Sequence, residues 1–261
     1  MKQHTKTLGQ VFLHDQNIIN KIITLASPKP EHPIIEIGCG KGILTQALAE
    51  IAPVNVIEID ERWINHVSDL SLKNVTFTHI DALKVDYSMF PKGAPIIANI
   101  PYQITSPLIE LFTQYNHHLG PITIMIQKEM AERLVADPGS KQYGSMSIFC
   151  NYYFDINKGF GVSRNCFTPP PNVDSQVIQL TAKAPLLPAN DEPLFFAMTR
   201  TLFWGRRKTI IKCLKTGPYL ALQDGYPDRP EFKHRGESLS LNELKGLFEV
   251  LQPYLKLRPN S

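Results

Sequence analysis

The sequence predicts an α/β fold in which a largely parallel sheet is covered by helices on both faces, followed by a small all-α C-terminal domain. Two observations support this prediction. Short runs rich in Ile and Val alternate with helical patterns through the first half of the chain, which is typical of a buried parallel sheet. Beyond about residue 183, the strand pattern gives way to amphipathic helical segments.

Five apolar runs are the expected parallel strands. They lie at residues 33–37, 54–59, 75–79, 95–99 and 122–126. Helices are expected at residues 43–51, 61–70, 105–115 and 128–135. Most of the strands are therefore separated by a helical crossover, which parallel neighbours require.

The pattern changes after the fifth strand. Residues 147–154 and 173–180 are expected to be two strands without a clear helix between them, and therefore an antiparallel hairpin at the sheet edge. The segment Thr168-Pro169-Pro170-Pro171-Asn172 precedes the second of them. It can be neither helix nor central strand, because proline lacks the N–H that both need.

A boundary rich in Pro and Ala lies near residues 183–193. We expect one domain over residues 1–183 and a helical domain over residues 184–261, with amphipathic helices at 194–214 and 241–251. Ser240 and Glu243 have the Ser-x-x-Glu spacing of a capping box, which marks the start of the last helix.

The composition is that of a globular chain, with 43% hydrophobic and 20% charged residues among 261. No apolar run reaches the roughly 18 residues of a membrane span, and the polar N-terminus lacks the apolar core of a signal peptide, so a cytoplasmic protein is expected. The four cysteines are scattered without a Cys-x-x-Cys pair, so neither a disulfide framework nor a metal site is expected.

Charge is unevenly distributed along the chain. Residues 1–180 carry 14 Lys and Arg against 16 Asp and Glu, whereas residues 181–261 carry 13 against 8. The C-terminal excess includes Arg206, Arg207 and Lys208. Such a cluster can follow a phosphate backbone, but a solvated helix face is the simpler interpretation of a charge run.

Three glycines follow the first predicted strand, in the segment Glu36-Ile37-Gly38-Cys39-Gly40-Lys41-Gly42. Glycines at this point let the backbone approach a ligand closely, where a strand ends and a helix begins. Their Gly-x-Gly-x-Gly spacing differs from the Gly-x-Gly-x-x-Gly of dinucleotide-binding proteins. No Ser or Thr follows Lys41 to hold a nucleotide-bound magnesium ion.

Acidic residues follow the next two strands. Glu58 lies about 20 residues after the glycines, where an acid can accept both ribose hydroxyls of a nucleoside, and Asp81 can accept from an adenine amine. A surface salt bridge for Glu58 and helix capping for Asp81 are the alternatives. Because ligands of open α/β sheets bind at the carboxyl ends of strands, the combination favours a pocket for S-adenosylmethionine.

The tetrapeptide Asn99-Ile100-Pro101-Tyr102 ends the fourth predicted strand. The Asn99 side chain and the backbone near Pro101 can accept the two hydrogens of an amino group on an aromatic base, and the Tyr102 ring can stack on that base. The lone pair of such a nitrogen is delocalised into the ring, so two acceptors can redirect it toward a methyl donor. No strong general base is required, since the attacked sulfonium is already charged.

These motifs and several longer segments resemble the rRNA adenine N6,N6-dimethyltransferase family, and within it the KsgA type that acts on the small subunit. The further segments are Gly9-Gln10-Val11-Phe12-Leu13, Gln127-Lys128-Glu129, Lys141-Gln142-Tyr143-Gly144 and Phe167-Thr168-Pro169-Pro170-Pro171-Asn172-Val173-Asp174-Ser175. The last of them is highly specific. The resemblance covers most of the chain.

The resemblance implies a Rossmann-like class I methyltransferase domain with a helical C-terminal domain. It implies S-adenosylmethionine as the methyl donor, no metal, and a monomer. The implied substrate is two adjacent adenines in the 3′-terminal hairpin loop of small-subunit rRNA, within a pre-ribosomal particle.

Roles for individual residues also follow from the resemblance. The donor pocket would comprise Val11, Leu13, Gly38, Glu58, Asp81 and Asn99. Tyr102 and Phe167 would hold the target base between them, as flipped bases are commonly held, although core packing is the alternative for both rings. The candidates for RNA contact are Arg206, Arg207 and Lys208. The chain departs from the family pattern at Val11, where His or Asn is usual, and at Cys39, where Pro is usual.

Three alternative functions stay open at this point. A large-subunit rRNA methyltransferase of the macrolide-resistance type shares Asn-Ile-Pro-Tyr, but the Pro-rich run argues against it. A non-catalytic RNA-binding assembly factor would be expected to lose Asn99, Pro101 or Tyr102, and all three are present. A DNA amino-methyltransferase usually has an acidic residue or a second proline in the tetrapeptide.

Overall fold

The computed structural model describes residues 11–258, which form two compact units. The first unit contains the chain up to Ala131 together with Asp155–Ala182, and the second contains Glu132–Phe154 and the chain from Lys183 onward. This grouping differs from the expected division at residue 183 in the placement of residues 132–154, which pack with the C-terminal helices.

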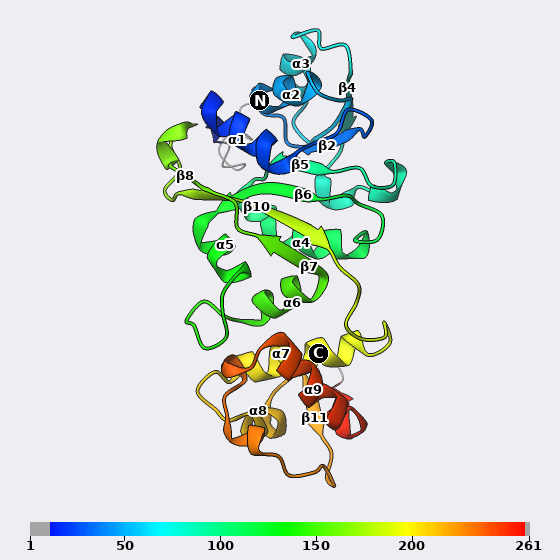
Figure 1. The fold of residues 1–261 in the computed structure, drawn as a ribbon, viewed down its shortest axis with the longest axis vertical. Helices are drawn as coiled ribbons and strands as arrows, with labels where there is room; N and C mark the ends of the chain where they lie inside the picture. The colour runs from blue at the N-terminus through cyan, green and yellow to red at the C-terminus, as the bar shows by residue number, and fades with distance from the viewer. Residues whose placement is uncertain (1–10, 259–261) are drawn as a thin grey trace, which may run out of the picture. The chain divides into compact units, whose positions relative to one another are not determined.

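The first unit is built on a mixed sheet with the strand order β4-β3-β2-β5-β6-β10-β7, in which β8 pairs with β10 (Figure 1). Its strands are β2 (Ile34–Ile37), β3 (Val54–Glu58), β4 (Val75–His79), β5 (Ile96–Asn99), β6 (Ile122–Gln127), β7 (Phe154–Asn157), β8 (Gly161–Val162) and β10 (Ser175–Ala182). Strands β2 to β6 run parallel, and β10 runs antiparallel to β6. The predicted fold class, with its antiparallel edge, is confirmed.

The first unit also contains β1 (Phe12–Leu13), which pairs with β9 (Phe167–Thr168). Its α-helices are α1 (Gln16–Ala26), α2 (Ile43–Ala49), α3 (Glu61–Ser68) and α4 (Thr105–Gln114), together with the first residues of α5 (Lys128–Leu134), which is divided between the two units. Its short 3₁₀ turns are η1 (Ala82–Lys84), η2 (Tyr87–Met89), η3 (Tyr102–Ile104) and η4 (Arg164–Cys166).

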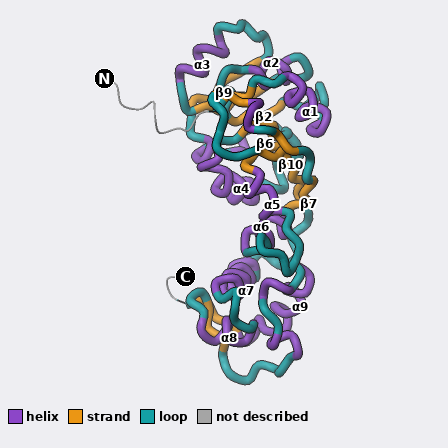
Figure 2. The backbone as a smooth tube through the Cα atoms, turned by 90° about the vertical axis from the view of Figure 1, so that its left-hand side faces the viewer, coloured by secondary structure: helices purple, strands orange, loops and turns teal. Residues whose placement is uncertain are grey.

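Helix α1 was not predicted, although its signals are in the sequence. The Asp15 side chain caps it by accepting from the backbone N–H groups of Asn17 and Ile18. Ile18 and Ile22 lie four residues apart on one buried face. Figure 2 shows the sheet between α1 and α4, so both of its faces are covered.

One of the predicted strands is wrong. Most of residues 147–154 belong to helix α6 (Ser145–Tyr153), and the strand begins only at Phe154. Ile148 and Tyr152 lie four residues apart on one face of α6 and are both buried in the core of the second unit. Short apolar segments rich in aromatic residues fit either periodicity, so the pattern did not distinguish helix from strand.

The second unit is mainly helical. Besides α6, it contains α7 (Glu192–Trp204), α8 (Ile210–Thr216), α9 (Leu241–Leu251), the turns η5 (Pro230–Lys233), η6 (Gly236–Ser238) and η7 (Gln252–Tyr254), and the strand pair β11 (Leu220–Leu222) and β12 (Leu255–Leu257). This strand pair was not predicted. Helix α9 and its capping box are as predicted, since Ser240 Oγ accepts from Glu243 N and Glu243 Oε2 accepts from Ser240 N.

The single helix predicted over residues 194–214 is two helices. The chain leaves the helix at Gly205, where a side chain would lie 2.6 Å from Cys213 Sγ. Cys213 lies in α8, and its thiol donates to the Gly205 carbonyl at 3.3 Å. The close approach of the two helices therefore requires glycine at this position.

Candidate active site

A cavity of about 340 Å³ lies at the carboxyl ends of β2, β3 and β5 in the first unit. The chain order reverses here, because β3 follows β2 on one side and β5 lies on the other. Such a switch point is where open α/β sheets bind ligands. Every predicted donor residue lines this cavity: Val11, Leu13, Gly38, Glu58, Asp81 and Asn99. We call it the donor pocket.

The glycine loop shapes one wall of the donor pocket. Gly38 has a φ of +75° and Gly40 a φ of +48°, which are left-handed conformations that favour glycine. A side chain at Gly40 would also lie 3.1 Å from the Phe12 ring. At Gly38 and Gly40 the loop thus presents backbone without side chains to the pocket.

Glu58 is held by the backbone that follows its strand. Its Oε1 accepts from the N–H groups of Ile59 at 2.8 Å and Asp60 at 2.9 Å. The Cys39 thiol donates to its Oε2 at 3.8 Å. Burial and then the Glu58 and Glu36 carboxylates raise the pKa of Cys39, so this thiol stays protonated and is a poor nucleophile.

Glu36 also lines the donor pocket, although it was not among the predicted site residues. It is fully buried, and neither of its carboxylate oxygens has a hydrogen-bond partner among the described residues. Burial raises the pKa of Glu36 to about 8; the nearby Thr45 hydroxyl opposes this rise, and the charge of Glu58 adds to it. A buried acid without partners suits a positively charged ligand group. The sequence feature that could have identified Glu36 is the single charged residue inside the otherwise apolar strand Ile34-Ile35-Glu36-Ile37.

Two further residues that carry polar groups line this pocket. Asp81 accepts from Leu83 N at 3.0 Å through Oδ1 and so caps η1, which is the structural role considered for it, while it also lines the pocket. Trp63 was not predicted. Its ring packs on Phe12 with centroids 4.7 Å apart, and its buried Nε1 has no hydrogen-bond partner within residues 11–258.

The tetrapeptide Asn99 to Tyr102 forms the boundary between the donor pocket and a second hollow. Asn99 ends β5 opposite Met125 of β6, and Ile100 N donates to the Met125 carbonyl at 3.3 Å. The Tyr102 hydroxyl lies 2.8 Å from Ser175 Oγ of β10, and burial raises the pKa of Tyr102. Asn99, Pro101 and Tyr102 all line the donor pocket.

The second hollow adjoins the donor pocket and shares three residues with it. It is lined by Val11, Tyr102, Gln103, Gln127, Pro171, Asn172 and Val173. We call it the acceptor hollow. The Pro-rich segment therefore faces the tetrapeptide across this hollow.

Phe167 does not line either cavity. Its ring is 1% exposed and packs in the core that contains α1 and α2. Leu13 lies opposite it in the β1–β9 pair, which fixes its backbone. The structure thus brings Tyr102 to the predicted base site but leaves Phe167 behind it. Gly9 and Gln10 of the N-terminal motif lie outside the described residues.

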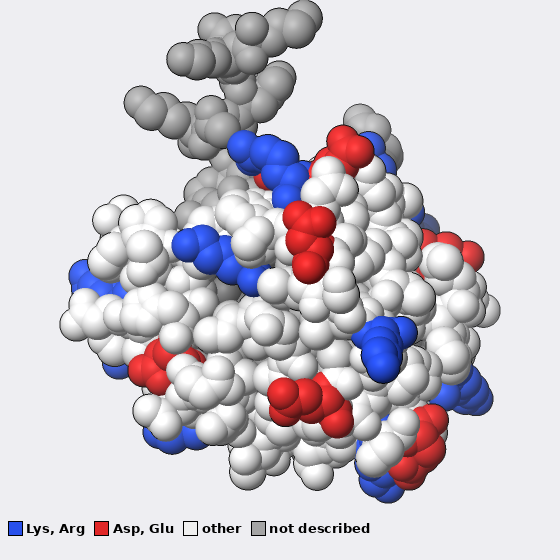
Figure 3. Space-filling model, turned by 90° about the horizontal axis from the view of Figure 1, so that it is seen from above, with Lys and Arg blue, Asp and Glu red and all other residues white. Residues whose placement is uncertain are grey.

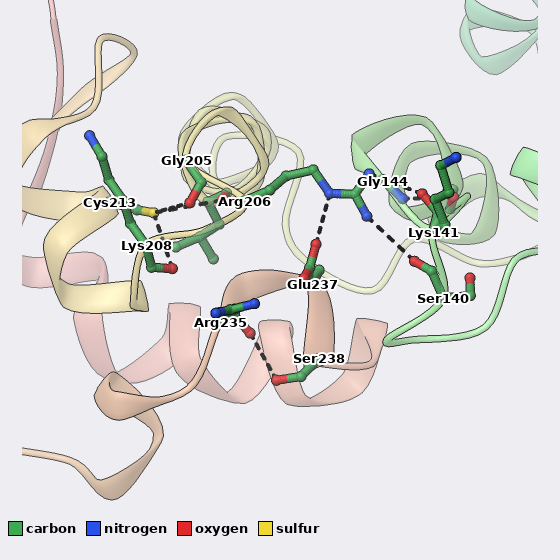
Figure 4. A network of polar contacts seen from close by, with 12 residues as sticks. Ser140, Lys141, Gly144, Gly205, Arg206, Lys208, Cys213, Arg235, Glu237 and Ser238 are labelled. Carbon is green, nitrogen blue, oxygen red and sulfur yellow. Dashed lines mark hydrogen bonds and ion pairs between the residues drawn. The ribbon is translucent and has the colours of Figure 1, made fainter.

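The basic cluster lies in the second unit, where its members differ in environment. The Arg206 guanidinium is held by contacts within the second unit. Its Nε forms an ion pair with Glu237 at 2.7 Å, and its terminal nitrogens donate to the carbonyls of Lys141 at 3.0 Å and Ser140 at 3.4 Å (Figure 4). Arg207 is exposed, and Lys208 Nζ lies 4.4 Å from the ring centre of Trp204, which is 51% exposed.

One face of the molecule carries charges of both signs. On the face that Figure 3 shows, lysines and arginines lie among aspartates and glutamates rather than in a block of one sign.

Across residues 11–258, no group of three or more His, Cys, Asp or Glu side chains could hold a metal ion. None of the described helices is long and apolar enough to span a membrane.

The chain matches the family model of the ribosomal RNA adenine dimethylases over residues 1–224. It belongs to this family. Bacterial relatives named Ribosomal RNA small subunit methyltransferase A include that of Bacillus pumilus, which is 38% identical over 96% of this chain and 92% of its own length. The relative from Chlorobium limicola is 37% identical over 95% of this chain and 93% of its own length.

Two solved methyltransferase structures share the fold of this chain. The dimethyladenosine transferase of Plasmodium falciparum has a TM-score of 0.76 at 27% identity, covering 93% of this chain and 98% of its own. The 23S rRNA methyltransferase ErmE has a TM-score of 0.75 at 25% identity, covering 92% and 99%. The chain is therefore an S-adenosylmethionine-dependent methyltransferase of ribosomal RNA, as the sequence predicted.

Proposed function

We propose that this family member transfers methyl groups from S-adenosylmethionine to the N6 amines of two adjacent adenines in the 3′-terminal hairpin loop of small-subunit rRNA. It would act as a cytoplasmic monomer on a pre-ribosomal particle. The observation that carries the proposal is that Asn99, Pro101 and Tyr102 line the donor pocket while Tyr102 also lines the acceptor hollow. The names of the relatives that are 37–38% identical support the small subunit as the target.

The donor pocket fits S-adenosylmethionine, because three acids face its three polar parts. The unpartnered Glu36 suits the ammonium group of the methionine part. Glu58 would accept the ribose hydroxyls, and Asp81 would accept the adenine amine through the oxygen that does not cap η1. When bound, the donor supplies an electrophilic methyl group on a positively charged sulfonium.

Residues at the boundary between the donor pocket and the acceptor hollow would hold the target adenine. The Asn99 side-chain oxygen and the Pro101 backbone carbonyl would accept the two N6 hydrogens, which orients the nitrogen lone pair toward the donor pocket. Tyr102 would stack on the base, its ring fixed by the hydrogen bond between its hydroxyl and Ser175. Phe167 would complete the sandwich after the residues that bury it have moved, since its ring is enclosed in the free protein.

The second unit would supply contacts to RNA phosphates. Arg207 and Lys208 are the cations that we assign to this role, with the exposed Trp204 ring beside Lys208. Arg206 would act as a positioning residue, because its guanidinium holds Glu237 and the loop at Ser140 and Lys141 (Figure 4). Contacts of this kind carry shape and charge recognition rather than sequence.

The large-subunit alternative shares the fold, since the 23S rRNA methyltransferase ErmE superposes over 92% of this chain. The small-subunit proposal is favoured over it because the relatives with higher identity carry the small-subunit name. A role as a purely structural assembly factor is disfavoured, because the donor pocket and the complete tetrapeptide lie next to each other.

The test is methyl transfer from labelled S-adenosylmethionine to unmethylated small and large ribosomal subunits in parallel, followed by nuclease digestion. We expect dimethyladenosine from the small subunit alone. Label in the large subunit would favour the resistance-type activity instead. Absence of label in both, with the donor still bound, would contradict the proposed reaction.

A further inference from the structure

Gln127 is a polar residue that the sequence motif Gln127-Lys128-Glu129 contains and that the proposed reaction does not use. The structure places it in the lining of the acceptor hollow, with Tyr102 and the Pro-rich segment. It is partly exposed, and its side-chain amide has no hydrogen-bond partner among the described residues. A free amide in a hollow next to a methyl-donor pocket is a candidate for contact with the substrate.

The backbone of Gln127 is fixed by strands on both sides of β6. Two residues earlier, Met125 lies opposite Asn99 of β5. Gln127 itself lies opposite Ser175 of the antiparallel strand β10, and the next residue, Lys128, donates its N–H to the Asp174 carbonyl at 3.0 Å. Polar groups carried by strands are placed more accurately than those on loops.

The register also determines where the Gln127 side chain points. Residues directly opposite each other in an antiparallel pair project from the same face of the sheet, with Cβ atoms about 5 Å apart. Ser175 projects toward Tyr102, because its Oγ lies 2.8 Å from the tyrosine hydroxyl. The Gln127 side chain therefore leaves the sheet beside the Tyr102 ring, on which the target base would stack.

Two other amides line the same hollow, but neither is placed as well. Gln103 is exposed within the turn η3, and Asn172 is exposed in the Pro-rich segment, where its carbonyl accepts from Arg164. Only Gln127 combines a position on a paired strand with partial burial. It is therefore the amide most suited to read one edge of a base.

We propose that Gln127 is a specificity-determining residue of the acceptor site, whose side-chain NH₂ donates a hydrogen bond to N1 of the target adenine. This inference rests on the proposed function. With N6 held by Asn99 and Pro101, the neighbouring acceptor on the Watson–Crick edge is N1, and flipped bases are commonly read on that edge. Guanine carries a hydrogen at N1, so the same amide donor would oppose it.

The test uses small-subunit particles reconstituted with rRNA whose target adenine is unmodified, 1-deazaadenine or 7-deazaadenine. Single-turnover methyl transfer is measured for the wild type, Gln127→Ala and the isosteric Gln127→Glu. The wild type should lose about tenfold in rate on the 1-deaza base and little on the 7-deaza base, as expected for one hydrogen bond. Both Gln127 variants should lose about tenfold on adenine and nothing further on the 1-deaza base.

Gln179→Ala is the matched control. Gln179 lies on β10 opposite Thr123, and its amide donates to Thr123 Oγ1 and to the Leu25 carbonyl, both at 3.2 Å. This variant should keep the wild-type ratio of rates on adenine and 1-deazaadenine. All variants should bind S-adenosylmethionine as the wild type does, which shows that the donor pocket is intact.

Two results would overturn the inference while leaving the proposed function in place. One is an unaltered rate of both Gln127 variants on adenine. The other is a full additional loss when a Gln127 variant meets the 1-deaza base, because additive losses mean that the amide and N1 do not interact. Absence of transfer by the wild type to the unmodified particle would overturn the proposed function, and this inference with it.

Discussion

The donor pocket and the acceptor hollow adjoin each other but are built differently. The donor pocket consists mainly of residues at strand ends and in the glycine loop, and Glu36 and Glu58 at its wall are buried. The acceptor hollow combines one strand residue, Gln127, with turn and loop residues that are partly or fully exposed. This difference indicates that the donor site is already formed in the free protein, whereas the acceptor site depends on loops that RNA can still reposition.

The largest effect is expected at the boundary of the two hollows. Asn99→Ala removes an acceptor for the N6 hydrogens, so we expect methyl transfer to fall about 10²- to 10³-fold, as for other groups that orient a reacting atom. Binding of S-adenosylmethionine should change little although Asn99 lines the donor pocket, because its amide is assigned to the N6 hydrogens of the base rather than to the donor. Single-turnover transfer together with calorimetry of donor binding checks both parts, and full activity would contradict the acceptor role of Asn99.

A change confined to the donor pocket should have the opposite effect: it should lower donor affinity and leave the rate of transfer nearly unchanged. Glu36→Gln should weaken S-adenosylmethionine binding roughly 10- to 100-fold, the range for a hydrogen bond to a charged group. Transfer at saturating donor should be nearly unchanged. The dissociation constant from calorimetry decides this, and an unaltered value would remove Glu36 from the donor site.

The buried Glu36 carboxyl predicts that donor binding depends on pH. Burial raises the pKa of Glu36 to about 8, so the free protein carries it protonated at neutral pH, and pairing with the donor ammonium releases that proton. Donor binding by the wild type should therefore tighten as the pH rises from about 6 toward 8. Calorimetry at pH 7 in buffers of different ionisation enthalpy should detect the proton release in the wild type and none in Glu36→Gln.

Substitutions at the proposed RNA-contact residues should change particle binding without changing the donor pocket or the acceptor hollow. Reversing Arg207 and Lys208 to Glu should weaken particle binding by about tenfold and reduce its salt dependence, because fewer counterions are released. The double variant Lys73→Glu/Lys256→Glu, at two exposed lysines outside the cluster, is the charge-matched control. If affinity and salt dependence match those of this control, the cluster is a solvated surface.

The smallest effect is expected behind the acceptor hollow. Ser175→Ala removes the partner of the Tyr102 hydroxyl, and one hydrogen bond between neutral groups corresponds to a loss of about threefold to tenfold in transfer efficiency. The donor affinity should be unaltered. A loss of donor affinity instead would mean that Tyr102 supports the donor pocket rather than the base.

The sequence predicted the donor site better than the acceptor site for a physical reason. Parallel strands bring their carboxyl ends to one edge, so Gly38, Glu58 and Asn99 could be placed together from the strand pattern alone. Gln127 could not be assigned in this way, because its position depends on the register of β10 against β6. Register is set by long-range pairing that a local pattern does not contain.

The remaining differences also depend on contacts in the fold that a local sequence pattern does not contain. Phe167 belongs to a specific motif, but the motif gives no measure of burial, and the structure encloses its ring. Arg206 and Arg207 are neighbours of the same type, yet only the structure shows that Glu237, 31 residues later, is the ion-pair partner of Arg206. Glu36 was present in the glycine-loop motif, but its role depends on the absence of a partner in the fold.

The most direct test of the separation between the two hollows is calorimetric titration of S-adenosylmethionine into the Glu36→Gln/Asn99→Ala double variant in the absence of RNA. If the donor pocket is complete without the acceptor groups, the double variant should bind the donor as Glu36→Gln alone does, within about twofold. A further loss of tenfold or more would mean that Asn99 is part of the donor-binding energy. The donor pocket and the acceptor hollow would then form a single binding site, which contradicts their separation.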